Sequence, residues 1–263
     1  MTNRGPILAG LAALLFSTVS ATAADLGGMK GGSIKDGYMP AMHEPSMARF
    51  YLRADYSHGW NSFGNLTEPP NYDLTQTSIG NSHSWGVGVG YYFSKNVRAD
   101  ATFDWRRDAA VRGSVTDVNA TVQGERQFNV NNMVALANVY YDFDLRSHFT
   151  PYLGVGLGVA RNTTSAGTVA LSGCQTNTCS ADFDGATQWN AAGALMAGFT
   201  ARLHDRVHLD AGYRFLYLGN AHTGDIRITR AVVTPGAPTT SPDPIVHDLS
   251  AHEFRVGLRF DIK

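Results

Sequence analysis

The sequence predicts an all-β protein, an eight-stranded antiparallel up-and-down transmembrane β-barrel, and three observations support this fold class. Residues 97–105 alternate strictly, with Val97 and Phe103 on an apolar face and Arg98 and Asp104 on a polar one. This period of two indicates a β-strand with two unlike faces. The alternation recurs in eight segments, none apolar on both faces, and they follow an export signal. Together these features indicate lipid outside the barrel and a polar lumen inside.

The export signal occupies the N-terminus. Residues 7–19 form an apolar run of roughly a dozen residues, and Ala21-Thr22-Ala23 gives the small-x-small pattern of a cleavage site. The alternative is a retained membrane anchor, but a transmembrane helix needs about 20 apolar residues. We therefore expect an exported chain that begins near Ala24.

Eight alternating segments are joined by connections that alternate between long and short. The predicted strands are residues 50–60, 85–93, 97–107, 130–143, 151–159, 189–203, 207–217 and 254–262. Short turns are expected at 94–96, 146–148 and 204–206, and long loops at about 61–84, 108–128, 160–188 and 218–250. Short periplasmic turns and long external loops are typical of outer-membrane barrels. The predicted organisation is a signal peptide (1–23), a periplasmic N-terminal linker (24–48) and the barrel with four external loops (49–263).

Each strand has an outward and an inward set of side chains. In the first strand Leu52 faces outward and Arg53 inward, and the second and fifth strands alternate valine or leucine with glycine. The fourth strand is expected to turn Val139 outward, the sixth Leu195 and the seventh Tyr213. About ten tilted residues cover an apolar band of ~25 Å, so these lengths suit a membrane span.

Aromatic residues mark both ends of the predicted strands. They fall in outward register, with tryptophans at the loop side and phenylalanines at the turn side: Trp60, Trp85, Trp105, Trp189, Phe93, Phe143 and Phe260. Such girdles lie at the two interfaces of membrane barrels. The alternative, a soluble lipocalin-like barrel, would place its large apolar residues inside and would need no girdle.

The inward face carries charges of both signs in similar number. They are Arg53, Asp55, Arg98, Asp100, Asp104, Arg202, Asp210, Arg214, Glu253, Arg255 and Arg259. An eight-stranded barrel leaves an interior that side chains just fill, so a paired and filled lumen is expected. The inward glycines of the second and fifth strands would make room for the arginines of neighbouring strands. A gated ion path is the alternative interpretation.

Other candidate chemistry in the sequence is weak. Cys174 and Cys179 are expected to close a local disulfide in a loop, with a free or intermolecular thiol as the alternative. His83-Ser84 and His252-Glu253 lie near outer strand ends, but neither pair matches a hydrolase motif. We therefore predict no catalytic, cofactor-binding or metal-binding residues, and no enzyme.

Three phrases of the sequence resemble a known family. They are Phe50-Tyr51-Leu52-Arg53-Ala54-Asp55-Tyr56, Asn138-Val139-Tyr140-Tyr141-Asp142-Phe143 and Thr150-Pro151-Tyr152-Leu153-Gly154-Val155-Gly156. Together with the export signal and the strand pattern, they resemble small outer-membrane β-barrels of the OmpA-domain and opacity-protein kind, including surface antigens of alphaproteobacteria. The resemblance covers nearly the whole mature chain and implies a barrel, without specifying an activity.

These expectations define a leading function and two alternatives. The leading hypothesis is a monomeric protein of the bacterial outer membrane that supports envelope integrity and presents its loops for interaction or adhesion. Its expected partners are outer-membrane lipid and lipopolysaccharide, the barrel-assembly machinery and a host or surface ligand. The net charge of −1 argues against nucleic acid. The alternatives are a narrow porin-like channel for ions or small molecules and, more remotely, a lipid A-modifying enzyme.

Overall fold

The structure is a computed structural model. It describes residues 50–67, 72–117, 123–145, 148–172, 179–230, 240–241 and 245–262. The expected signal peptide, the N-terminal linker and Cys174 lie outside these residues. Among the residues described, no helix is long and apolar enough to cross a membrane.

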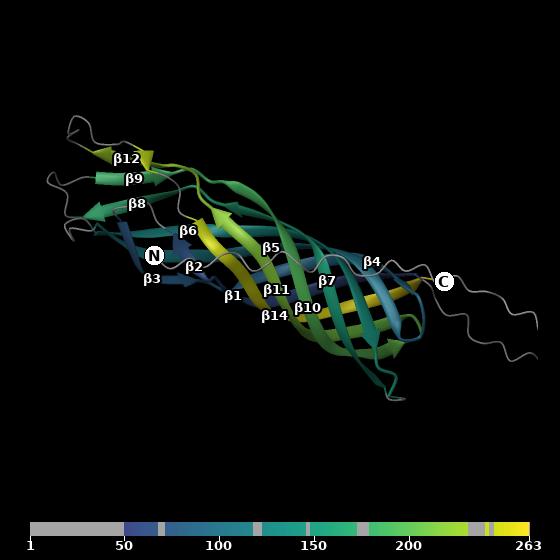
Figure 1. Ribbon diagram of the computed structural model, residues 1–263. Coiled ribbons are helices and arrows are strands. Elements are labelled where there is room, and N and C mark those ends of the chain that lie inside the picture. Colours follow the sequence, from purple (N-terminus) through teal and green to yellow (C-terminus); the bar gives the residue numbers. More distant parts are fainter. Residues whose placement is uncertain are drawn as a thin grey trace, which may run out of the picture. The chain divides into compact units, whose positions relative to one another are not determined.

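Eight long strands form a closed antiparallel ring, which confirms the predicted fold class (Figure 1). The ring strands are β1 (Phe50–Ser62), β4 (Ser82–Tyr92), β5 (Val97–Asp117), β6 (Gln123–Asp142), β7 (Phe149–Thr164), β10 (Thr187–His204), β11 (Val207–His222) and β14 (Ile245–Ile262). Each pairs with its neighbour in the sequence, and β14 returns to β1 with Phe50 opposite Ile262 and Ser62 opposite Ser250. This closure leaves no open edge around the ring, as lipid requires.

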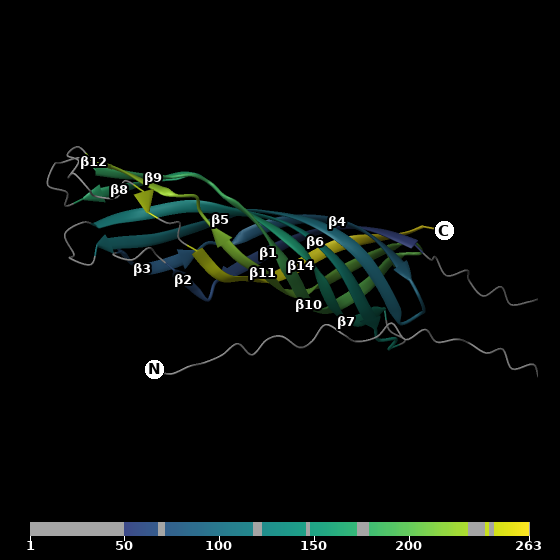
Figure 2. The same cartoon turned by 45° about the horizontal axis from the view of Figure 1, so that its top comes forward.

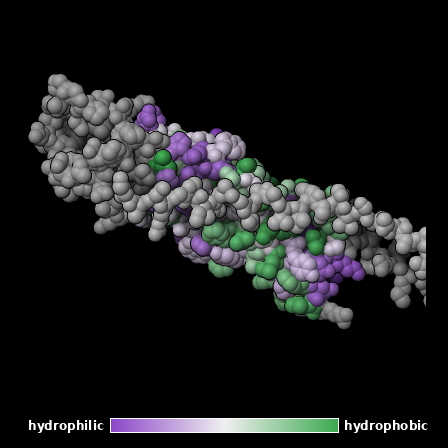
Figure 3. Space-filling model, in the orientation of Figure 1, coloured by the Kyte–Doolittle hydropathy of each residue, from purple (hydrophilic) through white to green (hydrophobic). Residues whose placement is uncertain are grey.

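Exposure alternates along the ring strands as a membrane barrel demands. On β1, Leu52 is 50% exposed whereas Arg53 is 5% exposed. On β7, Leu157 is 75% exposed, and the glycines that alternate with it face the lumen. The apolar side chains therefore cover the outer wall, where Figure 3 shows hydrophobic residues gathered. A soluble barrel would have the opposite arrangement.

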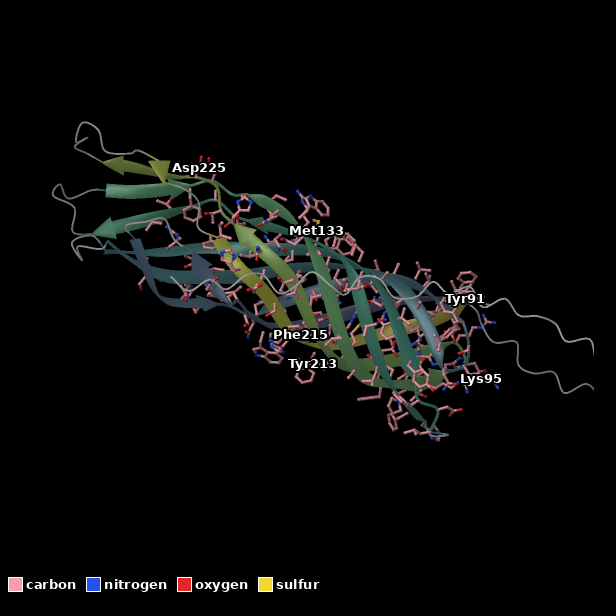
Figure 4. All side chains as sticks on the ribbon, viewed as in Figure 1. Tyr91, Lys95, Met133, Tyr213, Phe215 and Asp225 are labelled. Carbon is pink, nitrogen blue, oxygen red and sulfur yellow. The ribbon has the colours of Figure 1, made fainter. Side chains whose placement is uncertain are left out.

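The turn end of the barrel is compact. Between β4 and β5, the Ser94 hydroxyl accepts hydrogen bonds from the backbone amides of Asn96 at 3.2 Å and Val97 at 3.0 Å. Asp205 and Arg206 alone separate β10 from β11. Figure 4 shows Tyr91 and Lys95 at this end and Asp225 at the opposite end.

The outer connections differ from the expected polar loops, because much of each is β-structure. Ring strands β5 and β6 reach 21 and 20 residues. The outer connections also contain six short strands: β2 (Asn65–Thr67), β3 (Tyr72–Ile79), β8 (Gly167–Ser172), β9 (Cys179–Phe183), β12 (Ile226–Arg230) and β13 (Thr240–Ser241). A bulge between Arg106 and Ala109 interrupts the alternation of β5. The register beyond it is set by long-range pairing, which the local pattern does not show.

These additions make a sheet outside the barrel, which we call the external sheet and define as β3, β8, β9, β12, β13 and the outer halves of β5 and β6. Strand β3 pairs with β5, and β8 pairs with both β6 and β9. Strand β9 then pairs with β12, and Figures 1 and 2 show β8, β9 and β12 side by side. Apolar residues pack within this part of the protein, with the rings of Phe128 and Phe183 in a T-shaped contact at 6.0 Å.

Candidate functional site

The lumen holds a chain of buried ion pairs whose outer part centres on Arg214. Its guanidinium donates to Asp104 Oδ2 at 2.5 Å and to Glu253 Oε2 at 2.6 Å. Arg214 and Glu253 lie directly opposite on β11 and β14, whereas Asp104 reaches them from β5. Arg106 also contacts Glu253 and donates to Ser82 Oγ at 2.9 Å. These five side chains connect four strands of the ring.

The central part of the lumen is built around Asp55. Arg53 binds it through two hydrogen bonds, Nε at 2.9 Å and Nη2 at 2.8 Å, and Arg255 adds a third at 2.8 Å. Arg53 also donates to Asp100 at 2.7 Å and to the Tyr140 hydroxyl at 3.0 Å. Since alternate residues of β1 share one face, Arg53 and Asp55 point into the lumen together. Asp55 therefore links cations from two strands.

The turn end of the lumen combines ion pairs with aromatic rings. Arg98 donates to Asp142 Oδ2 at 3.0 Å, and its guanidinium lies 4.2 Å from the ring centre of Tyr140. Such a cation–π contact stabilises the part of the Arg98 guanidinium that no carboxylate contacts. Arg259 approaches Asp210 at 3.7 Å, so this end is also closed by paired charge.

The inward glycines make room for neighbouring side chains, although arginines are not their main occupants. A Cβ at Gly86 would overlap the Asp104 carboxylate, and one at Gly156 would overlap the Asn138 amide. At Gly88 the expected arginine is present, because a Cβ there would come within 3.0 Å of Arg53 Cγ. The glycines thus allow polar side chains to lie flat against the wall.

The structure buries all but one of the eleven charged residues expected in the lumen. The buried set is Arg53, Asp55, Arg98, Asp100, Asp104, Asp210, Arg214, Glu253, Arg255 and Arg259. Arg202 is exposed, because it lies at the turn end of β10 beside the bulge between Arg202 and His204. Arg202 is therefore not part of the buried network.

Two members of the network were missing from the predicted set. Arg106 and Asp142 are buried, and they have the inward parity of Asp104 and Tyr140 on their own strands. Both lie within the strands that the sequence predicts, and the alternation that turns Asp104 and Tyr140 inward turns these two residues inward as well.

The other candidate positions fall outside the lumen. The aromatic residues expected at the rims, Trp60, Trp85, Trp105, Trp189, Phe93, Phe143 and Phe260, are all exposed. The expected pairing of Cys174 with Cys179 lies outside the described residues. Ser84 is buried while His83 is exposed, and Glu253 is buried while His252 is exposed, so each pair is divided between two faces. No group of three or more potential metal ligands occurs in the part of the chain described.

A closed ring with an apolar outer wall and a charged interior defines an outer-membrane β-barrel. The chain belongs to the outer membrane protein β-barrel domain family, which it matches over residues 9–260. It is an outer-membrane protein.

Its relatives include proteins named as putative adhesins. An uncharacterized protein of Brucella suis is 31% identical over 295 residues, covering 99% of this chain and all of the relative. A putative adhesin of Rickettsia prowazekii is 26% identical over 181 residues, covering 67% of this chain and 72% of the relative. The outer membrane protein PagN of Salmonella typhimurium is 26% identical over 152 residues, covering 53% and 62% respectively.

The solved structures that match the chain are more distant in sequence. Neisserial surface protein A is 19% identical, with a TM-score of 0.43, and the match covers 81% of this chain and 97% of that one. The attachment invasion locus protein Ail of Yersinia pestis is 11% identical, with a TM-score of 0.41, and the match covers 81% of this chain and all of that one.

Proposed function

We propose that the protein is a closed surface barrel whose external sheet binds a partner outside the cell, in adhesion or a related contact. The observation that carries this proposal is the length of β5 and β6, which have 21 and 20 residues. A tilted membrane-spanning strand needs only about ten. Both strands therefore continue well beyond the level of Trp105, which marks the outer rim.

Pairing and packing give the external sheet a defined surface. Phe128, Val169 and Phe183 are buried within it, so its shape is maintained by a small apolar core. A surface that is ordered before binding loses less conformational entropy when a partner docks. The relatives named as putative adhesins support a role in surface contact.

The proposal includes a supporting role in the envelope and no catalysis. A closed ring leaves no barrel edge for another subunit to complete, which supports a monomer. We expect the barrel-assembly machinery to insert it. The division of His83 and Ser84 between two faces supports a non-enzymatic role. Ion pairs that fill the lumen favour this role over a channel.

The experiment is a whole-cell binding assay with a trimmed external sheet. Residues 109–130 would be replaced by a short turn, in cells that carry no other adhesin, and binding to epithelial cells or matrix proteins would be measured. Cell binding should fall to the level of cells without the protein. Arg214→Ala is the matched control because it alters the lumen and keeps the external sheet.

A heat-modifiable gel shift would check that the trimmed barrel is folded and inserted. If the trimmed barrel still binds as well as the unmodified protein, the proposal is wrong.

A further inference from the structure

The outer end of β11 leaves the wall of the barrel and lies across the lumen. The ladder between β10 and β11 stops at Gly193 opposite Tyr217, although β10 itself begins at Thr187. Register shifts on both sides of Gly219 mark the place where β11 bends away from β10. We call residues 218–224 the outer lid. It consists of the last part of β11 and the start of the connection to β12.

Side chains of β7 bind the outer lid, although β7 is not a neighbour of β11 in the ring. The Asn162 amide donates to the carbonyls of Leu218 at 2.9 Å and Asn220 at 2.8 Å, and the Thr164 hydroxyl donates to the His222 carbonyl at 2.9 Å. Strand β10 lies between β7 and β11, so along the wall these two strands are about 10 Å apart. The contacts therefore require the lid to lie in front of β10, inside the ring.

The inward face of β10 also binds the outer lid. The Asn190 amide donates to the Asn220 carbonyl at 2.8 Å, and its side-chain oxygen accepts from the Asn220 amide at 3.2 Å. The φ angle of Gly219 is +74°, and a Cβ at this residue would lie 2.6 Å from the Cβ of Asn190. Glycine suits both the left-handed conformation and the close approach. At the far end of the lid, the Gly224 amide donates to the Asp184 carbonyl at 2.7 Å.

The outer lid lies at the outer end of the ion-pair network. Asn132 of β6 donates to the side-chain oxygen of Asn162 at 2.8 Å, and Asn132 is directly opposite Arg106, a member of the network. Leu218 of the lid is fully buried. The interior of an eight-stranded barrel is only wide enough for side chains to fill. A further length of main chain inside the ring therefore closes the lumen at this level.

We propose that residues 218–224 are a lid that closes the outer mouth of the lumen, and that Asn162 is the residue that holds this lid shut. An asparagine amide has two N–H donors, and Asn162 uses both on carbonyls of the lid. Without Asn162, these buried carbonyls would lose a hydrogen-bond donor, which favours a lid that swings outward into water. The ion pairs beneath the lid close the lumen at a second depth. This inference goes beyond the proposed function and holds whether or not the external sheet binds a partner.

The test is the labelling of a cysteine beneath the lid by a membrane-impermeant maleimide added to intact cells. Ala192 is buried on the inward face of β10, so Ala192→Cys is the probe, in a protein that also carries Cys174→Ser and Cys179→Ser. Thr187→Cys, exposed farther out on the same strand, gives the rate of an open site. We expect the probe to react at least about 100-fold more slowly, because it reacts only during local opening. Similar rates at the two positions would overturn the proposal.

Release of the lid should expose the probe. Asn162→Leu keeps the approximate shape of the side chain and removes both donors, so labelling of Ala192→Cys should become about tenfold faster or more, the effect of losing two hydrogen bonds. The matched control is Asn138→Leu, since Asn138 is an equally buried asparagine of the lumen that donates to Asp100 and Thr102. This control should leave the labelling rate unchanged. Equal increases from both variants would show a general loosening of the barrel and would overturn the proposal.

A second pair of variants makes the test independent of Asn162. In Gly219→Ala the new Cβ would overlap Asn190, so the lid should be displaced and the probe should again react faster. Gly193→Ala is the control, because the nearest atoms to its Cβ would be 3.9 Å away. A heat-modifiable gel shift identifies the folded barrels. If folded Asn162→Leu and Gly219→Ala both leave the probe as slow as in the unmodified protein, residues 218–224 are not a lid and the proposal fails.

Discussion

At Arg214 the lumen places one fully buried guanidinium between two carboxylates, Asp104 and Glu253. Arg214→Ala would leave Asp104 with Arg255 at 3.7 Å, and Glu253 with Arg106. Removing one partner of a buried pair typically costs about 3–5 kcal/mol, because the remaining charge stays desolvated. We expect a loss of that size in the free energy of unfolding, measured by urea titration in detergent.

The control for this prediction is His208→Ala at the turn end of the lumen. His208 contacts Asp261 at 2.9 Å, and both side chains remain partly exposed. Pairs in contact with water contribute about 1 kcal/mol or less. Equal losses from the two variants would show that burial of the Arg214 network does not govern its contribution.

Leu157 tests the lipid face of the barrel. It is 75% exposed at the middle of β7, where an arginine would meet the hydrocarbon. Leu157→Arg should lower the free energy of unfolding in lipid vesicles by about 2–4 kcal/mol. The matched control is Thr163→Arg, which has the same outward parity on the same strand but lies beyond Arg161 at the outer rim. There the cost should be about 1 kcal/mol or less, and a similar cost at both positions would contradict the assigned depth.

At the scale of elements, the external sheet and the ring are stabilised by different interactions. Phe183 of β9 is 3% exposed and packs on Phe128 of β6. Phe183→Ala should lower the free energy of unfolding of the external sheet by about 3–5 kcal/mol, because it leaves a cavity in the apolar core. We therefore expect the external sheet to become sensitive to protease on intact cells, while the gel mobility of the folded barrel is unchanged.

Phe199→Ala is the control for that element. Phe199 is exposed on the outer wall of β10, so its removal should leave protease resistance outside the membrane unaltered. Loss of the folded barrel itself in Phe183→Ala would show that ring and external sheet unfold as one unit.

For the whole molecule, a ring of eight strands filled by paired charge should pass little current. An eight-stranded barrel has an interior that side chains just fill. We expect few openings of the unmodified protein in planar bilayers, and more frequent openings of Arg214→Ala. A steady, ion-selective conductance of the unmodified protein would favour the channel alternative.

The export signal is also a prediction about the whole molecule. Cleavage after Ala23 should give a mature protein that begins near Ala24. N-terminal sequencing of the protein from outer-membrane fractions checks this. A protein that retains Met1 would contradict the assignment of a cleaved signal.

Much of the barrel could be predicted because alternation is a local property. Leu52 and Arg53 face opposite sides of β1 whatever pairs with it, so the lipid face, the lumen face and the number of long strands follow from the sequence. The same alternation predicts that Arg53, Asp55 and Arg214 point into the lumen, although it does not identify the residues with which they pair. The extension of β5 could not be read in this way, because the bulge after Arg106 breaks its alternation.

The sequence by itself determined that the chain forms an outer-membrane barrel with a charged lumen, because period, length and girdle residues are properties of single strands. Only the tertiary structure decided which charges meet. Asp104 and Arg214 are 110 residues apart in the chain, and their contact depends on barrel closure and strand register. The ion pair of Arg53 with Asp100, 47 residues apart, likewise depends on the register of β1, β4 and β5, because β1 and β5 are not neighbours in the ring.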